Sequence, residues 1–284
     1  MNYLLHILIM INIYVILTLS LNLLVGYTGL LSLCHAAFYG IGAYVTTLLM
    51  MKTGLNFSAA LMASVITSAL ISLIISLPSL RLKGDYFVLA SLGFQIIVFS
   101  ILYNWIDITQ GPYGIPGIPQ PVIFGLKINT LTDFFFFTSI ISIASGLLIW
   151  LITVSPYGRV LKAIREDEIA AASLGKNIYS FKVSAFAISA AFAAISGALF
   201  ATYIRYIDPT SFTLMEAIVI IGGAGSSSGP IIGTILMIFL PEILRFLRIP
   251  DAIVHNMRQI IYGFLLIILM HYRPKGIAGE YDFE

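Results

Sequence analysis

The sequence predicts an all-α integral membrane protein, a polytopic helical bundle of about eight or nine transmembrane segments. Hydrophobic residues make up 59% of the 284 positions and charged residues only 10%, a balance that excludes a soluble domain of this length. The apolar residues form continuous runs of helical length and not alternating strands of about ten residues, so a β-barrel is excluded as well.

Nine apolar runs in a single domain, residues 1–284, are the candidate spans. They lie near 4–25, 30–51, 57–77, 84–104, 131–154, 180–204, 212–223, 229–247 and 257–272. The run at 212–223 is short, because a helix needs roughly 20 residues to cross a bilayer.

Basic residues between the runs predict the orientation. One side of the membrane collects the larger group: Arg81, Lys83, Arg159, Lys162, Arg165, Lys176 and Lys182. The other side collects Lys52, Lys127 and Arg205. Since the larger group marks the cytoplasm, we expect the N-terminus and the 105–130 loop outside. Three arginines count against this arrangement, since they fall on the outer side: Arg245, Arg248 and Arg258.

The densest run of charge lies in residues 155–182. It opens with Ser155-Pro156, a favourable helix start. Apolar residues then recur at helical spacing among the charges, which predicts one or two short amphipathic helices on the membrane surface: they are Val160, Leu161, Ile164, Ile169 and Leu174. The segment is either a charged connection between spans or a docking element in which Gly175 ends the helix and turns the chain.

Two stretches interrupt apolar runs with glycine and serine. The first extends from Asn22 to His35 and the second from Glu216 to Pro230, and each contains a Gly-x-x-Gly step. This weak internal repeat predicts broken helices at corresponding positions of two halves, a pattern that indicates a transport pathway. Backbone groups freed at such breaks are tolerated only where protein or water covers them.

The translocation pathway is therefore expected along residues of both breaks: Asn22, Gly26, Gly29, Ser32, His35, Glu216, Gly222, Gly223 and Gly225. Glu216 is the strongest polar candidate, because a charge at membrane depth is costly without a partner or water. The alternative for the polar members is pairing with a neighbouring helix. Gly40 and Gly42 follow the first break, and for them the alternative to a pathway role is close packing between helices.

The 105–130 loop is predicted to be rigid and external. Three glycines and three prolines between positions 111 and 119 exclude a helix there and predict a series of turns. Its candidate functional residues are Thr109, Gly111, Gly114 and Pro116. The alternative is a tight surface turn without further function.

Motifs for catalysis or cofactor binding are missing from the sequence. It contains no phosphate-binding glycine loop with lysine, no metal-spaced His/Cys/Asp cluster, no Ser/His/Asp constellation and no nucleic-acid module. We therefore expect no catalytic residue, no metal and no cofactor, and energy for uphill transport must come from another subunit or an ion gradient.

With these stretches laid out, the chain resembles the permease subunit of a bacterial branched-chain amino-acid ABC importer, of the M type. The likeness covers nearly the whole length in fixed order. It is carried by Asn22 to Ser32, His35 to Tyr44, Arg81 to Phe87, Thr109 to Pro119, Gly158 to Gly175, Lys182 to Leu199, Gly222 to Pro230, Leu240 to Glu242 and Arg273 to Gly276.

The resemblance implies a coupling role for 155–182. Permeases of this kind dock on their ATPase through a Glu-Ala-Ala pattern followed by glycine, which Glu168, Ala170, Ala171 and Gly175 match with Ile169 inserted. The implied coupling residues are Gly158, Arg159, Arg165, Glu168, Ala170, Ala171 and Gly175.

The same resemblance implies an assembly in the bacterial cytoplasmic (inner) membrane. Its partners would be cytoplasmic ATP-binding subunits, a second permease of the H type and an extracytoplasmic substrate-binding protein, with no nucleic acid. The chain would translocate leucine, isoleucine and valine without being an enzyme itself. Two alternatives stay open: an ABC permease for urea or short amides, and an ion-driven carrier or channel, which would not need the 155–182 segment.

Overall fold

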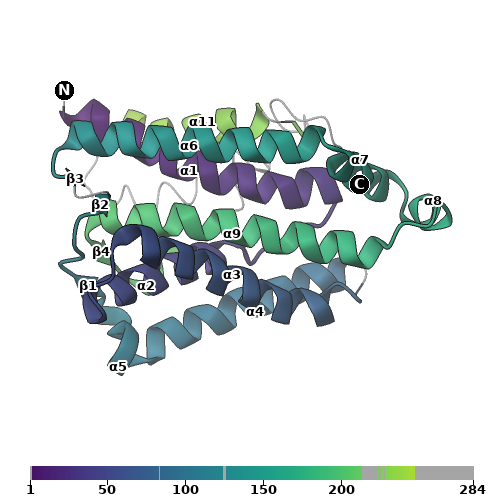
Figure 1. Cartoon of the computed structure of the whole chain (residues 1–284), viewed down its shortest axis with the longest axis horizontal. Coiled ribbons are helices and arrows are strands. Elements are labelled where there is room, and N and C mark those ends of the chain that lie inside the picture. The colour runs from purple at the N-terminus through teal and green to yellow at the C-terminus, as the bar shows by residue number, and fades with distance from the viewer. Residues whose placement is uncertain are drawn as a thin grey trace.

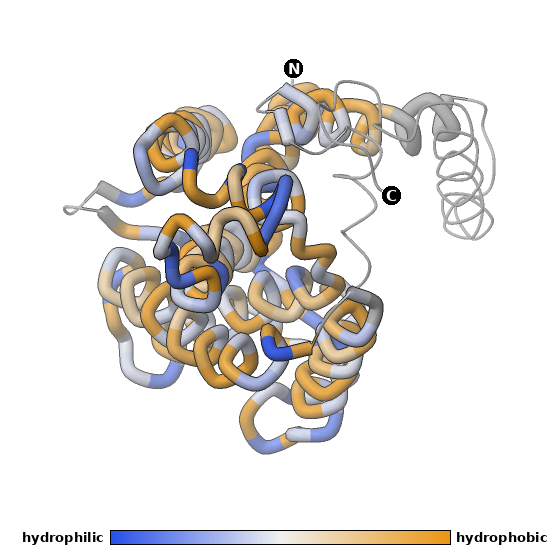
Figure 2. Tube along the Cα trace, turned by 90° about the vertical axis from the view of Figure 1, so that its right-hand side faces the viewer, coloured by the Kyte–Doolittle hydropathy of each residue, from blue (hydrophilic) through white to orange (hydrophobic). Residues whose placement is uncertain are grey.

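The computed structural model describes residues 2–82, 84–123, 126–212, 223, 225–226 and 228–246. Helices dominate and run side by side (Figure 1). Within the described residues, five helices are long and apolar enough to cross a membrane: α1 (Asn2–Thr28), α3 (Phe57–Ser79), α4 (Asp85–Asn104), α6 (Leu131–Val154) and α9 (Ile178–Ile204). They coincide with five of the predicted spans. Hydrophobic residues recur along each of the described helices (Figure 2).

Two further apolar helices are α2 (His35–Lys52) and α11 (Gly229–Phe246). The run predicted at 30–51 becomes helical only at His35, because Gly29 ends α1 with φ of +70° and residues 29–34 form no helix. α11 matches the run predicted at 229–247. The run at 257–272 and positions 213–222 lie outside the described residues.

Short elements occupy the two opposite ends of the bundle (Figure 1). One end, here the α7 end, carries α7 (Pro156–Glu166) and α8 (Glu168–Ser173), so two short helices form where one or two were predicted. The other, here the loop end, carries α5 (Ile106–Thr109), η1 (Gly111–Tyr113), β1 (Ile115–Pro116), β2 (Val122–Ile123), β3 (Leu126–Lys127), β4 (Tyr206–Ile207) and η2 (Pro209–Phe212).

The loop end is tied together by strand pairing. β1 pairs antiparallel with β4, with Ile115 opposite Ile207, and β2 pairs antiparallel with β3. The expectation that glycine and proline exclude a helix between 111 and 119 was wrong for one turn. Gly111, at φ of +52°, and Pro112 begin the 3₁₀ turn η1, since proline is well placed in the first turn of a helix.

α1, α2 and α9 form the centre of the bundle. In the apolar stretch of each long helix, 61% of the residues of α9 and 56% of those of α1 are buried. The corresponding share is only 22–28% in α3, α4 and α6. The outer helices therefore present most of their apolar side chains outwards, as expected for helices that face lipid.

Small residues let the outer helices approach the centre. Serine recurs at every fourth position of α3, and Ser64, Ser68, Ser72 and Ser76 are all fully buried. Ser68 Oγ donates to the carbonyl oxygen of Ala190 in α9 at 3.1 Å. Because apolar attraction between helices is weak in lipid, close backbone contact and hydrogen bonds of this kind hold α3 on α9.

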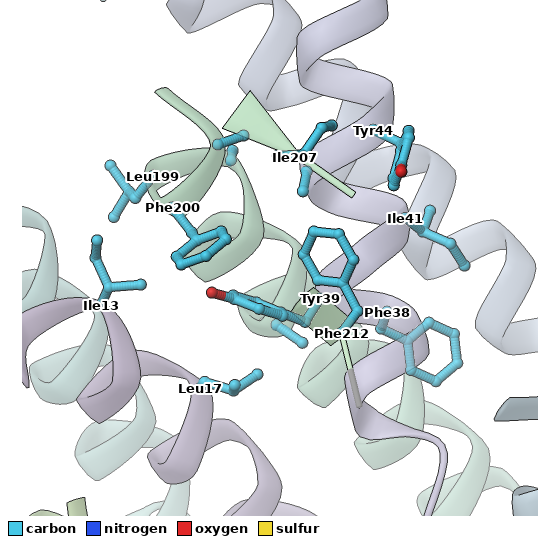
Figure 3. Close-up of a cluster of buried hydrophobic side chains, with 14 of the residues drawn as sticks. Ile13, Leu17, Phe38, Tyr39, Ile41, Tyr44, Leu199, Phe200, Ile207 and Phe212 are labelled. Carbon is cyan, nitrogen blue, oxygen red and sulfur yellow. The ribbon is translucent and has the colours of Figure 1, made fainter. Parts of the chain in front are cut away.

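Glycines bring α2 and α9 together most closely. A Cβ at Gly42 would overlap the backbone of Ala194, and one at Gly197 would overlap the carbonyl oxygen of Tyr39. The packing alternative considered for Gly42 is therefore confirmed. Towards the loop end, the Tyr39 ring meets those of Phe200 and Phe212 at centroid distances of 5.5 and 5.3 Å (Figure 3).

We expect Gly197→Ala to destabilise the chain, because overpacking a tight contact costs about 1–3 kcal/mol. Gly93→Ala in α4 is the matched control, since a Cβ there meets nothing within 4 Å and alanine is the better helix former by about 1 kcal/mol. Thermal unfolding in detergent should show a lower Tm for Gly197→Ala and an equal or higher one for Gly93→Ala. Equal shifts would contradict this account of the α2–α9 contact.

Candidate functional site

The two predicted breaks meet at the side chain of Asn22, in the last turns of α1. Its Oδ1 accepts a hydrogen bond from the Gly225 N–H at 2.9 Å, and its Nδ2 donates to the Ser226 carbonyl oxygen at 2.8 Å. Asn22 is only 2% exposed, so both halves of a buried amide are used. The asparagine thus satisfies two backbone groups that a broken helix would leave unpaired.

Gly26 allows the second break to approach α1 this closely. A Cβ at this position would overlap both Asn22 Oδ1 and the backbone nitrogen of Gly225. The structure therefore brings three predicted pathway residues together, one of them from a segment some 200 positions away.

Arg165 of α7 reaches the same place from the predicted coupling segment. Its Nη1 donates to the carbonyl oxygen of Gly26 at 2.6 Å, and its side chain is 11% exposed. The last carbonyls of a helix have no intrahelical partner, and a cation there is also favoured by the helix dipole. A Cβ at Gly29 would lie 3.2 Å from Arg165 Cγ. Pathway and coupling residues thus meet at the end of α1.

The first break lies at membrane depth. His35 Nε2 is 2.7 Å from Ser20 Oγ, and Ser20 lies roughly 12 Å before the end of α1 at a rise of 1.5 Å per residue. Residues 29–34 therefore cross this depth without forming a helix. The Leu33 N–H donates instead to Ser91 Oγ of α4 at 2.9 Å, so protein covers part of the freed backbone.

The predicted pathway residues form two groups in the structure. Asn22, Gly26 and Gly225 lie together, whereas Ser32 and His35 belong to the first break and its contacts with α1 and α4. The polar alternative is realised for His35, which pairs with Ser20 on a neighbouring helix. Gly223 is described and buried. Glu216 and Gly222 lie outside the described residues.

α7 is held against the bundle by its buried face and by its first turn. Leu161 and Ile164 are buried, whereas Arg159 is exposed. At Gly158 a Cβ would overlap the carbonyl oxygens of Ile152 and Thr153, so the glycine permits the sharp turn from α6.

Tyr157 fixes α7 to α9. Its Oη lies 2.7 Å from Ser184 Oγ. Burial raises the pKa of the Tyr157 hydroxyl, and the hydrogen bond with Ser184 opposes that shift. The phenol is therefore neutral at physiological pH, and the contact is insensitive to ordinary changes of pH.

α8 is held by two carboxylates. Asp167 Oδ1 caps the helix by accepting from the N–H groups of Ile169 and Ala170 at 2.8 and 3.0 Å. Glu168 forms an ion pair with Lys182 of α9, a partner within the chain that the sequence motif did not reveal. Ala171 is buried, Ala170 is exposed and Gly175 ends the segment at φ of +76°.

The apolar residues of α8 do not continue the buried face of α7. Ile169 is 83% exposed and Leu174 77% exposed, although helical spacing grouped them with Leu161 and Ile164. The capped turn at Asp167 rotates the chain between α7 and α8, so the spacing does not carry across it. α8 and its C-cap residue Leu174 thus present two large apolar side chains outward at the α7 end.

The predicted loop residues fix the shape of the loop end. Thr109 Oγ1 is buried and lies 2.7 Å from the carbonyl oxygens of Leu102 and Trp105. Gly111 and Gly114 take positive φ, and Pro116 is paired in β1. Within the described part of the chain, no three His, Cys, Asp or Glu side chains could hold a metal ion together.

Long apolar helices, breaks covered by side chains at membrane depth and an amphipathic segment at one end define a multi-pass membrane permease. The family model for the permease component of branched-chain amino acid transport systems matches residues 3–270, and the chain belongs to this family. It is a multi-pass protein of the inner membrane, and the family resemblance seen in the sequence is confirmed.

Two kinds of named relative are similar to the chain. The high-affinity branched-chain amino acid transport permease LivM of Escherichia coli is 37% identical, over 93% of this chain and 67% of the relative. A probable LivM of Methanocaldococcus jannaschii is 26% identical over 96% and 92%. The LivH permease of Escherichia coli is 25% identical over 95% and 92%. No solved structure matches the chain.

We expect Asn22→Ala to release the second break from α1. The buried N–H and carbonyl groups of residues 225 and 226 would lose their partner, at a cost of about 1–3 kcal/mol each. Hydrogen exchange followed by mass spectrometry should show faster exchange at Gly225. Asn12→Ala is the control in the same helix, because Asn12 bonds Ser139 instead. Unchanged exchange in Asn22→Ala would contradict the proposed restraint.

Proposed function

We propose that this chain is the M-type permease subunit of an ABC importer that carries leucine, isoleucine and valine inward, driven by partner ATPases. Family membership supports transport of this class, and relatives named for branched-chain amino acids share up to 37% identity. One observation carries the proposal. The exposed apolar surface at α8 lies next to α7, whose Arg165 donates a hydrogen bond to the Gly26 carbonyl oxygen at the end of α1.

The partner assignment follows from the relatives. Identity is higher to the LivM permease than to the LivH permease of the same organism, 37% against 25%. We therefore assign the M role to this chain and expect an H-type permease as its partner, an extracytoplasmic protein that delivers the amino acid, and two ATP-binding subunits.

The ATPase surface is proposed at α8. Ile169 in α8 and Leu174 directly after it are large, apolar and exposed, and they lie outside the long apolar helices. Such side chains are the usual anchors of a protein interface, filling pockets on the partner. An ion-driven carrier or a channel has no ATPase to bind and gives no reason for this surface. The argument therefore favours the ABC importer.

Coupling to the pathway is proposed through α7. A displacement of α7 acts on the Gly26 carbonyl through Arg165, and Asn22 in the same helix holds the segment 225–226. In alternating access, ATP-driven movement of α7 would then shift both breaks together and open the pathway from the outside to the inside. This is a shift between two arrangements of packed elements.

The pathway residues stay as the sequence predicted them, with their roles proposed. Asn22, Gly26, Gly29 and Gly225 set the geometry of the breaks, and Ser32 and His35 cover the first one. Glu216, Gly222 and Gly223 complete the proposed set. The α7 end is proposed to face the cytoplasm, because it gathers Arg81 and the cations of residues 155–182.

Reconstitution with the two ATPases and the partner permease tests the cargo. Leucine-loaded binding protein should stimulate ATP hydrolysis in liposomes several-fold, whereas urea-loaded binding protein should not. Stimulation by the urea-loaded form alone would change the cargo and keep the machine. Absence of any ATPase that copurifies with the chain would overturn the ABC assignment.

Two variants separate binding from coupling. We expect Ile169→Glu to weaken copurification of the ATPase about tenfold or more, because a charge replaces an interface anchor. Arg165→Gln should keep the ATPase bound and lower leucine uptake at least as strongly, because the Gly26 carbonyl loses its charged donor. Ile106→Glu, a matched exposed isoleucine at the loop end, should keep the ATPase bound. Equal loss of binding in all three variants would argue against α8 as the docking surface.

A further inference from the structure

A cleft at the α7 end adjoins the segment 225–226, and the transport mechanism above assigns it no ligand. It has a volume of about 350 Å³ and lies between the last turns of α1 and α6, the face of α7 and residues 225–226. Tyr27, Trp150, Val154, Arg159 and Lys162 line it. This volume is within the range of about 300–1,000 Å³ that small-ligand sites occupy.

The cleft is positively charged. Arg159 and Lys162 are three residues apart on α7, so they share one face of the helix. Lys162 Nζ lies 5.2 Å from the centroid of the Tyr27 ring, which places the ammonium group at the wall of the cleft. No carboxylate among the described residues lines it.

The acidic side chains nearest in sequence are engaged elsewhere. Glu166 is bound to Arg165, Asp167 caps α8 and Glu168 pairs with Lys182. Among the described residues, no carboxylate forms an ion pair with either cation of the cleft.

The cleft opens on the side of α6 that faces lipid. Trp150 and Val154 line it and are also 49% and 57% exposed. Leu147 and Ile143 lie about one and two turns before Trp150 on the same face and are 54% and 72% exposed. The exposed apolar stripe of α6 thus leads directly into the basic cleft, and tryptophan is the residue that prefers the level of lipid headgroups.

We propose that this cleft binds the headgroup of an anionic phospholipid from the leaflet at the α7 end. The phosphate lies between Arg159 and Lys162, and an acyl chain follows the exposed stripe of α6. A soluble phosphate would explain the two cations but not the continuous apolar stripe. Basic pockets between membrane helices are known to recognise lipid headgroups by this chemistry.

The chain offers a direct optical test. It contains two tryptophans, and Trp105 lies beyond α4 at the loop end, so Trp105→Phe leaves Trp150 as the single reporter. The purified full chain is placed in phosphatidylcholine liposomes with equal small fractions of phosphatidylglycerol or phosphatidylcholine that carry brominated acyl chains. We expect brominated phosphatidylglycerol to quench Trp150 about twofold or more strongly.

Charge variants decide whether the cleft is responsible. Arg159→Gln with Lys162→Gln should bring the quenching ratio of the two lipids to about one. Lys176→Gln, which removes an exposed cation outside the cleft, should leave the ratio unchanged. Equal quenching by both lipids, or a preference that survives in the double variant, would overturn the proposal.

Soluble phosphate distinguishes the source of the anion. Inorganic phosphate added against chloride at the same ionic strength should leave the lipid preference intact. Loss of the preference in phosphate alone would assign the cleft to a soluble phosphate and overturn the lipid proposal. No ATPase or binding protein is present, so the result is independent of the proposed transport function.

Discussion

The two hydrogen bonds of the Asn22 carboxamide hold the segment 225–226 against α1 at the α7 end of the bundle. In lipid, a backbone N–H or carbonyl group without a partner costs several kcal/mol, and the segment 225–226 meets this demand through one buried side chain of α1. The absence of a side chain at Gly26 makes the approach possible. Arg165 satisfies the adjacent end of α1, so a single helix terminus joins both breaks to α7.

In the rest of the bundle, helices are held together by close contacts and hydrogen bonds of small residues, whereas soluble proteins use large apolar side chains for this. The buried serines of α3 and the glycines of α2 and α9 let backbones come close, because burial of large side chains gains little when the surroundings are also apolar. Large residues are left for the outside, as the exposed stripe of α6 illustrates. α1, α2 and α9 thereby form the closely packed centre beside which the breaks lie.

Hydropathy alone located the five long helices, because run length and composition decide whether a segment can cross lipid. It misplaced the start of α2, because residues 30–34 are as apolar as a helix, and the contact of the Leu33 N–H with Ser91 in a distant helix is not visible in a local pattern. The spacing of the glycines singled out Gly26 and Gly225 as members of the two breaks. Their meeting, the partners Arg165 and Lys182, and the outward turn of Ile169 depend on contacts between distant segments, which no local pattern contains.

The ion pair between Glu168 and Lys182 has a consequence for the kinetics of assembly. It fixes α8 to α9 before any partner arrives, and the Asp167 cap fixes its first turn. A surface that is already ordered loses little conformational entropy on association, so more of the contact energy remains as affinity. The residence time of a partner on a helix held in this way would then be set by the contacts of the interface itself.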